Sequence, residues 1–276
     1  MSFKTILCVT GSQFDDTDPK IATSLCEEID AHLTVLVVEL AAPPPVGEYA
    51  AVISDDWLKE RGADQRRLER RMKALSSALA SAAVSVDVTG EYPEEVWADE
   101  TIGRRARYAD LVVVGPQMLA DGTLKRKTIE GTLFSSGTPA LLLPKGSRPS
   151  LKPKRILIAW DSSVEACNAV RGSLHMLQAA TEVHVVMIDP EESIHGEEPG
   201  ADLATYLARH GAKVIVRRLP SQGLSVAAVL KRSAVDTGAD LIAMGAYGHS
   251  RLRQRIFGGV TMSMIDEPPI PILIAR

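Results

Sequence analysis

The sequence predicts an α/β protein with two doubly wound, Rossmann-like parallel sheets, and three observations lead to this prediction. Hydrophobic residues make up 45% of the 276 residues but aromatic residues only 4%, so Val, Ile, Leu and Ala must fill the core, as in a parallel sheet covered by helices. Short apolar runs alternate with amphipathic segments along the chain. The order and spacing of these segments occur twice.

The repeat is carried by three pairs of segments. The members of each pair agree in apolar pattern, and the second pair shares an identical Ala-Asp-Leu opening and a final glycine. Their offsets are 150, 130 and 132 positions, for the pairs 6–12 and 156–162, 109–115 and 239–245, and 139–143 and 271–275. The polar segment 145–153 contains glycine and two prolines and separates the copies, which is typical of a linker. We therefore expect two domains, 1–148 and 149–276.

Each copy is expected to hold five parallel strands joined by right-handed helical crossovers. The first strand is the opening apolar run of each copy. The later strands are expected at 33–38, 84–88, 111–114 and 140–143 in the first copy, and at 183–188, 214–217, 241–244 and 272–274 in the second.

Helices are expected where apolar residues recur every three or four positions. The expected ranges are 21–29, 58–82, 94–108, 166–179, 203–209 and 226–237. The basic run Arg66 to Lys73 falls within the second range and is interrupted by Glu69, so we interpret it as a solvated helix face. The basic segment 124–127 is expected to be a solvated loop.

Charge and composition exclude several classes of protein. With 35 acidic and 31 basic residues the formal net charge is −4, which gives no electrostatic reason to expect nucleic acid as a partner. No run of about 18 apolar residues indicates a membrane span, so no membrane partner is expected. The three cysteines have neither metal nor disulfide spacing, and we expect buried free thiols in a cytoplasmic protein.

The turn after the fourth strand of the second copy is the main candidate site. Gly245 and Gly248 follow the strand, and Gly258 comes after nine further residues. Glycines let backbone amides approach an anion, and a helix starting near Gly258 would direct its N–H groups at a phosphate. His249 and nearby arginines add positive charge. Asp161, which follows the first strand, could accept hydrogen bonds from ribose hydroxyls or cap the next helix.

This Gly-x2-Gly-x9-Gly pattern, with an Asp ending the first strand, resembles the universal stress protein family, and the layout resembles its two-domain members. The resemblance implies two sheets packed as an internal pseudo-dimer through their last strands, and it leaves a further homodimer open. It also implies ATP or another adenine nucleotide as ligand, with or without Mg²⁺. The residues assigned to the nucleotide by the resemblance are Asp161, Met187, Met244, Gly245, Gly248, Gly258, Gly259, Val260 and Thr261. His249 is added to this site for its positive charge.

Departures from the family pattern distinguish the two copies. Gly259 stands where the family has Ser or Thr, and the turn after the first strand reads Asp161-Ser162-Ser163 instead of Asp-Gly-Ser. In the first copy Gly11 replaces the Asp and the second motif glycine is missing. We therefore expect the first copy to keep the fold but to lack a nucleotide site of the usual kind.

The expected function is a stress-response binding module that holds an adenine nucleotide in its second domain and contacts an unidentified protein partner. Two alternatives remain open: a structural or regulatory interaction protein without nucleotide, and a slow ATPase that would use His249 or an arginine. The sequence has no P-loop and no Gly-x-Ser-x-Gly elbow, so neither a P-loop NTPase nor a serine hydrolase is expected. The histidines lack partners at ligand spacing, and no metal site or catalytic residue is expected.

Overall fold

The computed structural model describes residues 3–43, 55–190, 198, 200–246 and 259–276. The chain separates into two compact units, which we describe one at a time. The first unit runs from Phe3 to Ser136, and the second from Gly137 to Arg276. The boundary between units precedes the expected linker, because the strand that follows Gly137 packs within the second unit.

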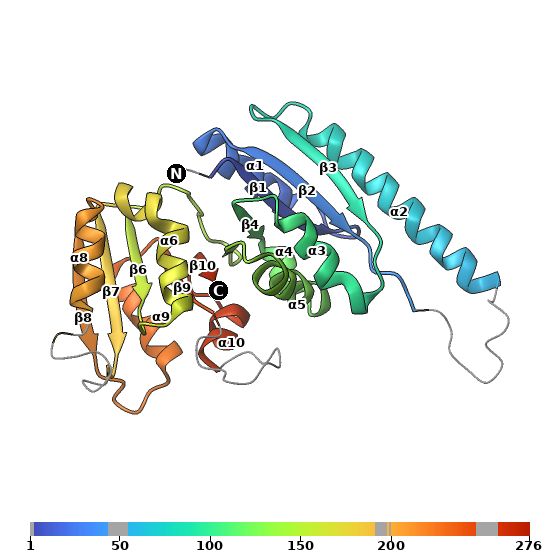
Figure 1. The fold of residues 1–276 in the computed structure, drawn as a ribbon. Helices are drawn as coiled ribbons and strands as arrows, with labels where there is room; N and C mark the ends of the chain where they lie inside the picture. Colours follow the sequence, from blue (N-terminus) through green and yellow to red (C-terminus); the bar gives the residue numbers. More distant parts are fainter. Residues whose placement is uncertain (1–2, 44–54, 191–197, 199, 247–258) are drawn as a thin grey trace. The chain divides into compact units, whose positions relative to one another are not determined.

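The first unit contains a parallel sheet with the strand order β3-β2-β1-β4. Helices α1 and α2 pack on strands β1, β2 and β3, whereas α3 packs with α5 on the opposite face (Figure 1). The strands are β1 (Thr5–Gly11), β2 (His32–Val38), β3 (Val86–Glu91) and β4 (Leu111–Val114). The helices are α1 (Thr17–Ile29), α2 (Asp55–Leu79), the 3-10 turn η1 (Glu95–Trp97), α3 (Ala98–Ala106), α4 (Pro116–Ala120), α5 (Thr123–Glu130) and the π-helical segment η2 (Gly131–Ser136).

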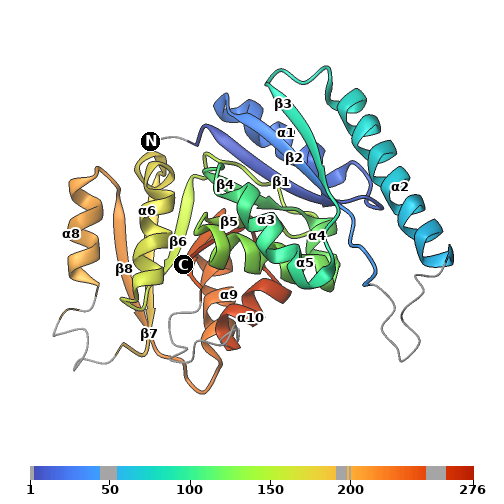
Figure 2. The same ribbon diagram turned by 45° about the vertical axis from the view of Figure 1, so that its right-hand side comes forward.

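The second unit repeats this strand order as β8-β7-β6-β9-β10, all parallel. Helices α6 and α8 cover one face of the sheet and α9 and α10 the other, as the second view shows (Figure 2), and as right-handed crossovers require. The strands are β6 (Arg155–Ala159), β7 (Glu182–Ile188), β8 (Val214–Leu219), β9 (Leu241–Gly245) and β10 (Ile272–Ala275). The helices are α6 (Val164–Ala179), α8 (Ala201–Arg209), α9 (Val226–Thr237) and α10 (Gly259–Asp266).

Strand β5 (Ala140–Leu142) completes the sheet of the second unit. It pairs with β10 in the antiparallel direction, with Leu141 opposite Leu273. All three residues of β5 are buried, so the pairing covers an apolar edge that would otherwise expose unpaired N–H and C=O groups. The expected pairing between the last strands of the two copies is therefore confirmed.

The repeated Ala-Asp-Leu motif has the same structural role in both units. Asp110 accepts hydrogen bonds from the backbone N–H groups of Lys4 (2.7 Å) and Thr5 (2.9 Å). Asp240 accepts them from Lys154 (2.9 Å) and Arg155 (3.0 Å). Each aspartate thus ties the start of the fourth strand to the start of the first strand, which lies beside it in the sheet.

The expected strands are all present, with ends that differ by a few residues, but the segment between β4 and β5 was misjudged. Residues 124–127 are not a solvated loop, because they lie in α5, where Leu124 and Ile129 are buried. The helical period was hidden in the sequence because Thr128 and Glu130, both polar, complete the buried face. Lys127 forms an ion pair with Asp99 at 3.3 Å, and both side chains are largely buried.

Two further expectations concern thiols and membranes. Cys8 and Cys26 are buried free thiols, as expected, whereas Cys167 is only half-buried. Burial raises the pKa of Cys26 to about 12, so this thiol stays protonated at neutral pH. Among the helices of the described residues, none combines the length and the apolar character that a membrane span needs.

The aspartate ties predict a measurable loss of stability in a variant. Asp240→Ala leaves the N–H groups of Lys154 and Arg155 without their carboxylate acceptor, and we expect the free energy of unfolding to fall by about 1–2 kcal/mol. Asp236→Ala is the matched control, since it removes an exposed carboxylate of α9 and should change stability by less than about 0.5 kcal/mol. Urea denaturation followed by circular dichroism measures both. Equal effects of the two substitutions would show that the tie contributes nothing.

Candidate functional site

The candidate site of the second unit lies at the carboxyl edge of its sheet, where the strand order reverses between β6 and β9. Ligands of open parallel sheets bind at this switch point. The register aligns Ala159 of β6 with Val186 of β7 and Met244 of β9, so the residues that follow these three positions emerge at one edge. Helix α10 leads into β10, which runs parallel to β9, and its N-terminus therefore faces the same edge.

Asp161 follows β6 in an exposed turn that fixes its carboxylate. Its Oδ1 accepts hydrogen bonds from the backbone N–H (3.0 Å) and from the hydroxyl (2.6 Å) of Ser163. Ser163 is the N-cap of α6, because its Oγ accepts a hydrogen bond from the N–H of Ala166 at 3.1 Å. Asp161 is thus not the cap itself, and it orients the residue that is.

Ser162 has a left-handed backbone conformation, with φ of 61°. The resembled family has glycine at this position, and glycine adopts positive φ without the steric penalty that a Cβ atom brings. Serine in place of glycine at position 162 therefore carries a steric penalty, which the sequence alone did not show. The turn that positions Asp161 keeps a glycine conformation although a serine occupies it.

Met187 and Met244 are core residues, with exposed fractions of 1% and 4%. Met187 lies on β7 beneath the first residues of α8, where a Cβ atom on Gly200 would be 3.2 Å from its sulfur. Met244 lies on β9 between Ala159 and Ile274. Both thioethers fill gaps in the core, as methionine commonly does. Because the two side chains are buried, a nucleobase at this edge would contact the residues at the ends of β7 and β9.

Gly245 is required by packing between β9 and α6. A Cβ atom at this position would lie 2.5 Å from the backbone nitrogen of Ala166 and 2.6 Å from the carbonyl carbon of Glu165. These are backbone atoms, which cannot move aside as a flexible side chain can. The first glycine of the motif therefore has a structural reason to be glycine that is independent of any ligand.

Helix α10 begins at Gly259, close to the helix start that the sequence predicted. The N–H groups of Gly259, Val260 and Thr261 lie in the first described turn of α10, toward the positive end of its dipole. Gly259 is exposed, and no heavy atom of the described residues lies within 4 Å of the place where its Cβ would be. Gly248, His249 and Gly258 lie outside the described residues.

In the first unit a side chain of the protein occupies the place beside the glycine that follows the fourth strand. A Cβ atom on Gly115, which follows β4, would lie 2.2 Å from the carboxyl carbon of Asp18. That buried carboxylate accepts hydrogen bonds from the N–H groups of Gln117 (3.0 Å) and Met118 (2.9 Å) in the first turn of α4. Desolvation raises the pKa of Asp18, and the two N–H groups partly oppose this shift.

An aromatic ring takes the place of the carboxylate at the end of β1. Gly11 is the counterpart of Asp161, and a Cβ on Gly11 would lie 3.0 Å from Cε1 of Phe14. A longer side chain at position 11 would have to displace this ring. The first unit thus has Phe14 where the second unit has Asp161. It also has the Asp18 carboxylate beside Gly115, the glycine that follows its fourth strand.

Helix α2 adds a partly buried ion-pair network to the same edge of the first unit. Arg67 donates two hydrogen bonds to the Glu39 carboxylate, at 2.6 and 3.0 Å, and another at 2.5 Å to Asp64. Ser12 also donates to Glu39. Tyr92 donates to Asp64 at 2.8 Å, and burial together with the Asp64 carboxylate raises the pKa of Tyr92 to about 12.

The sequence reasoning missed these residues because it interpreted the basic run of α2 as a solvated face. That interpretation is wrong for Arg67 and for Arg71, whose side chain is 13% exposed and pairs with Asp16 at 2.7 Å. Two signals were available: Arg67 and Arg71 are four residues apart on one helix face, and Glu39 directly follows the strand that ends at Val38.

Fold and edge together define the class, a Rossmann-like α/β protein with two doubly wound sheets. Comparisons with known proteins identify the family. Residues 152–276 match the model of the universal stress protein family. The whole chain is similar to the universal stress protein Slr1230 of Synechocystis, with 24% identity over 293 residues that cover 98% of this chain and 99% of that protein.

Solved structures agree on the fold. A universal stress protein from Archaeoglobus fulgidus covers 99% of this chain and 96% of its own, with a TM-score of 0.69 and 17% identity. A protein of unknown function from Pseudomonas aeruginosa PAO1 covers 99% and 92%, with a TM-score of 0.61 and 17% identity. Residues 152–276 therefore form a universal stress protein domain, and the whole chain is similar to a member of that family.

The two adjacent serines of the Asp161 turn predict opposite effects on stability. Ser162→Gly removes the Cβ from a left-handed residue, and we expect the free energy of unfolding to rise by up to about 1 kcal/mol. Ser163→Ala removes the N-cap of α6 and should lower it by about 1 kcal/mol. Thermal unfolding of the two variants measures the difference. A loss of stability in Ser162→Gly would contradict the account of this turn.

Proposed function

We propose that the second unit binds an adenine nucleotide at the carboxyl edge of β6, β7 and β9, and that the bound nucleotide changes contacts with a protein partner. The observation that carries the proposal is the orientation of Asp161. Ser163 holds Oδ1 of this exposed carboxylate at 2.6 and 3.0 Å, in the turn that follows β6 at the switch point of the sheet. A carboxylate in this position suits the hydroxyl donors of a ribose.

The start of α10 supports a phosphate position at the same edge. The N–H groups of Gly259 to Thr261 form the first turn of an eight-residue helix, and such groups stabilise an anion. The family supports the nature of the ligand, because universal stress proteins can bind adenine nucleotides. The glycine spacing at 245, 248 and 258 is the pattern of the nucleotide-binding members that the sequence resembles.

The alternative function, a structural or regulatory protein without nucleotide, is favoured by one observation. A Cβ atom on Gly245 would lie 2.5 Å from the backbone of α6, so part of the glycine pattern would persist for packing alone. For the same reason a Gly245 variant cannot test the proposal, since loss of binding would accompany loss of packing. Asp161 and Gly259 are the informative positions.

Calorimetric titration of the full chain with ATP, with and without Mg²⁺, tests the proposal directly. We expect saturable binding, and about tenfold weaker binding for Asp161→Ala. Asp161→Asn is the matched variant, because its amide oxygen can still accept from Ser163, and it separates the loss of charge from the loss of the turn. Absence of binding at millimolar ATP would overturn the proposal, and unchanged affinity in Asp161→Ala would remove this residue from the site.

Gly259→Ser predicts a gain of affinity. The family has Ser or Thr at this position, and the described surroundings leave room for a side chain. One added hydroxyl donor to a phosphate should strengthen ATP binding about fivefold, as expected for one net hydrogen bond. Gly122→Ser is the control, because this position also has open space and lies in the first unit. Gly223→Ser, in the loop before α9, is not suitable because the φ of Gly223 is 82°. Equal affinities of wild type and Gly259→Ser would contradict the proposed phosphate position.

A further inference from the structure

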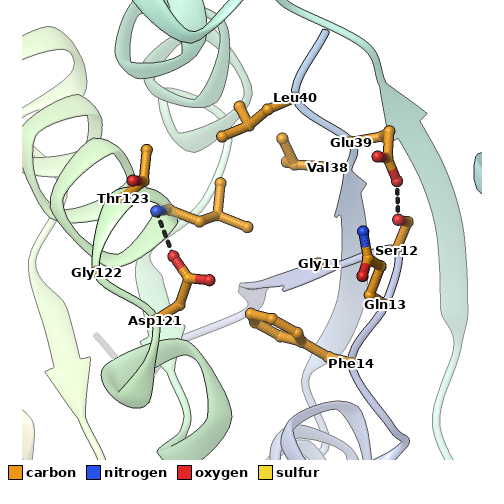
Figure 3. Close-up of a pocket in the computed structure, with 11 residues that line it drawn as sticks. Gly11, Ser12, Gln13, Phe14, Val38, Glu39, Leu40, Asp121, Gly122 and Thr123 are labelled. Atoms are coloured by element: carbon orange, nitrogen blue, oxygen red, sulfur yellow. Dashed lines mark hydrogen bonds between the residues drawn. The ribbon is translucent and has the colours of Figure 1, made fainter. Parts of the chain in front are cut away.

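The first unit has a cleft of about 390 Å³ at the carboxyl ends of β1 and β2. This volume lies within the usual range of small-molecule sites. Figure 3 shows the side chains that surround it, with Phe14 and Asp121 facing the same opening from two sides. The cleft is lined by residues 11–14 after β1, residues 38–40 after β2 and residues 121–124 between α4 and α5.

Phosphate groups do not suit this cleft. The N–H groups of Gln117 and Met118, which begin α4 and would attract an anion, already bind the buried carboxylate of Asp18 at 3.0 and 2.9 Å. The Asp121 carboxylate lines the cleft itself, and it would repel a phosphate. The anion position is thus filled from within the protein.

The carboxylate with spare capacity in the cleft is Asp121. Its Oδ1 accepts a hydrogen bond from the N–H of Leu124 at 2.6 Å, which fixes the side chain at the start of α5, while an ionised carboxylate can accept several hydrogen bonds. Glu39, in contrast, is neutralised by the two hydrogen bonds from Arg67. The half-buried Asp121 therefore gives the cleft a negative charge.

Apolar side chains form the remaining walls. Phe14 lies over Gly11, with Cε1 3.0 Å from the position of a Cβ on that glycine, and Val38, Leu40 and Leu124 line the space with it. An aromatic face beside a carboxylate attracts a cation by its quadrupole as well as by apolar contact. The walls thus suit the body of a small organic molecule, and Asp121 suits a positively charged head group.

We propose that this cleft binds a small organic cation, an ammonium or amidinium group carried on a short apolar or aromatic body. The proposal is independent of the nucleotide proposed for the second unit, since every lining residue belongs to the first. The two units of the chain then take ligands of opposite charge.

Three probes of the same shape test the charge preference on the full-length protein. Benzamidine is a cation, benzamide is neutral and benzoate is an anion. We expect calorimetric titration to show benzamidine binding about tenfold more tightly than benzamide, and benzoate to bind more weakly than both. Absence of benzamidine binding at millimolar concentrations, or equal binding of benzoate and benzamidine, would overturn the proposal.

Two variants separate the contribution of the Asp121 charge to the affinity from that of the apolar wall. Asp121→Asn keeps an oxygen acceptor for the N–H of Leu124 but removes the charge, so the affinities for benzamidine and benzamide should become equal within about twofold. Phe14→Ala should weaken both probes and retain a preference for benzamidine. Glu69→Gln, which removes an exposed carboxylate from α2, is the control for net charge and should behave as wild type. A benzamidine preference that persists in Asp121→Asn would place the cation elsewhere and refute the assignment.

Discussion

The close contact between the first helix and the glycine that ends the fourth strand determines what each unit can hold. A Cβ atom on Gly245 of the second unit would lie 2.5 Å from the backbone of α6, and a Cβ atom on Gly115 of the first unit would lie 2.2 Å from the Asp18 carboxyl carbon of α1. Both glycines are needed because no Cβ fits. What reaches the strand end differs, since one unit brings backbone and the other brings a charged side chain. In the first unit that carboxylate binds the N–H groups of Gln117 and Met118, which follow the strand.

The first unit is therefore not a copy of the second that has merely lost its polar contacts. Its buried carboxylate binds the first-turn N–H groups of α4, Phe14 occupies the space beside Gly11, and Arg67 of α2 neutralises Glu39. A buried charge is stable only with such partners. Helix α2, with 25 residues, supplies Arg67 as the partner of Glu39. The two units thus share a strand order but differ in the polar contacts at the ends of their strands.

The sequence predicted the fold well because the strands are buried on both faces and are read as continuous apolar runs. It also predicted the edge where Asp161, Gly245 and the start of α10 meet, since parallel topology places these positions together. It could not predict the role of Asp18, because its partners, the N–H groups of Gln117 and Met118, lie about 100 positions away. Nor could it assign Gly245 to packing, because glycine required by a ligand and glycine required by a neighbouring helix look alike in a sequence.

The central claim is that the two units share a fold but differ in ligand chemistry, and amide chemical-shift mapping of the full chain tests it most directly. The account predicts that ATP perturbs the amides of residues 161–166, 245–246 and 259–261, and leaves those of residues 11–14 and 121–124 unchanged. Shifts in the first-unit residues on addition of ATP, at concentrations that saturate the protein, would contradict it.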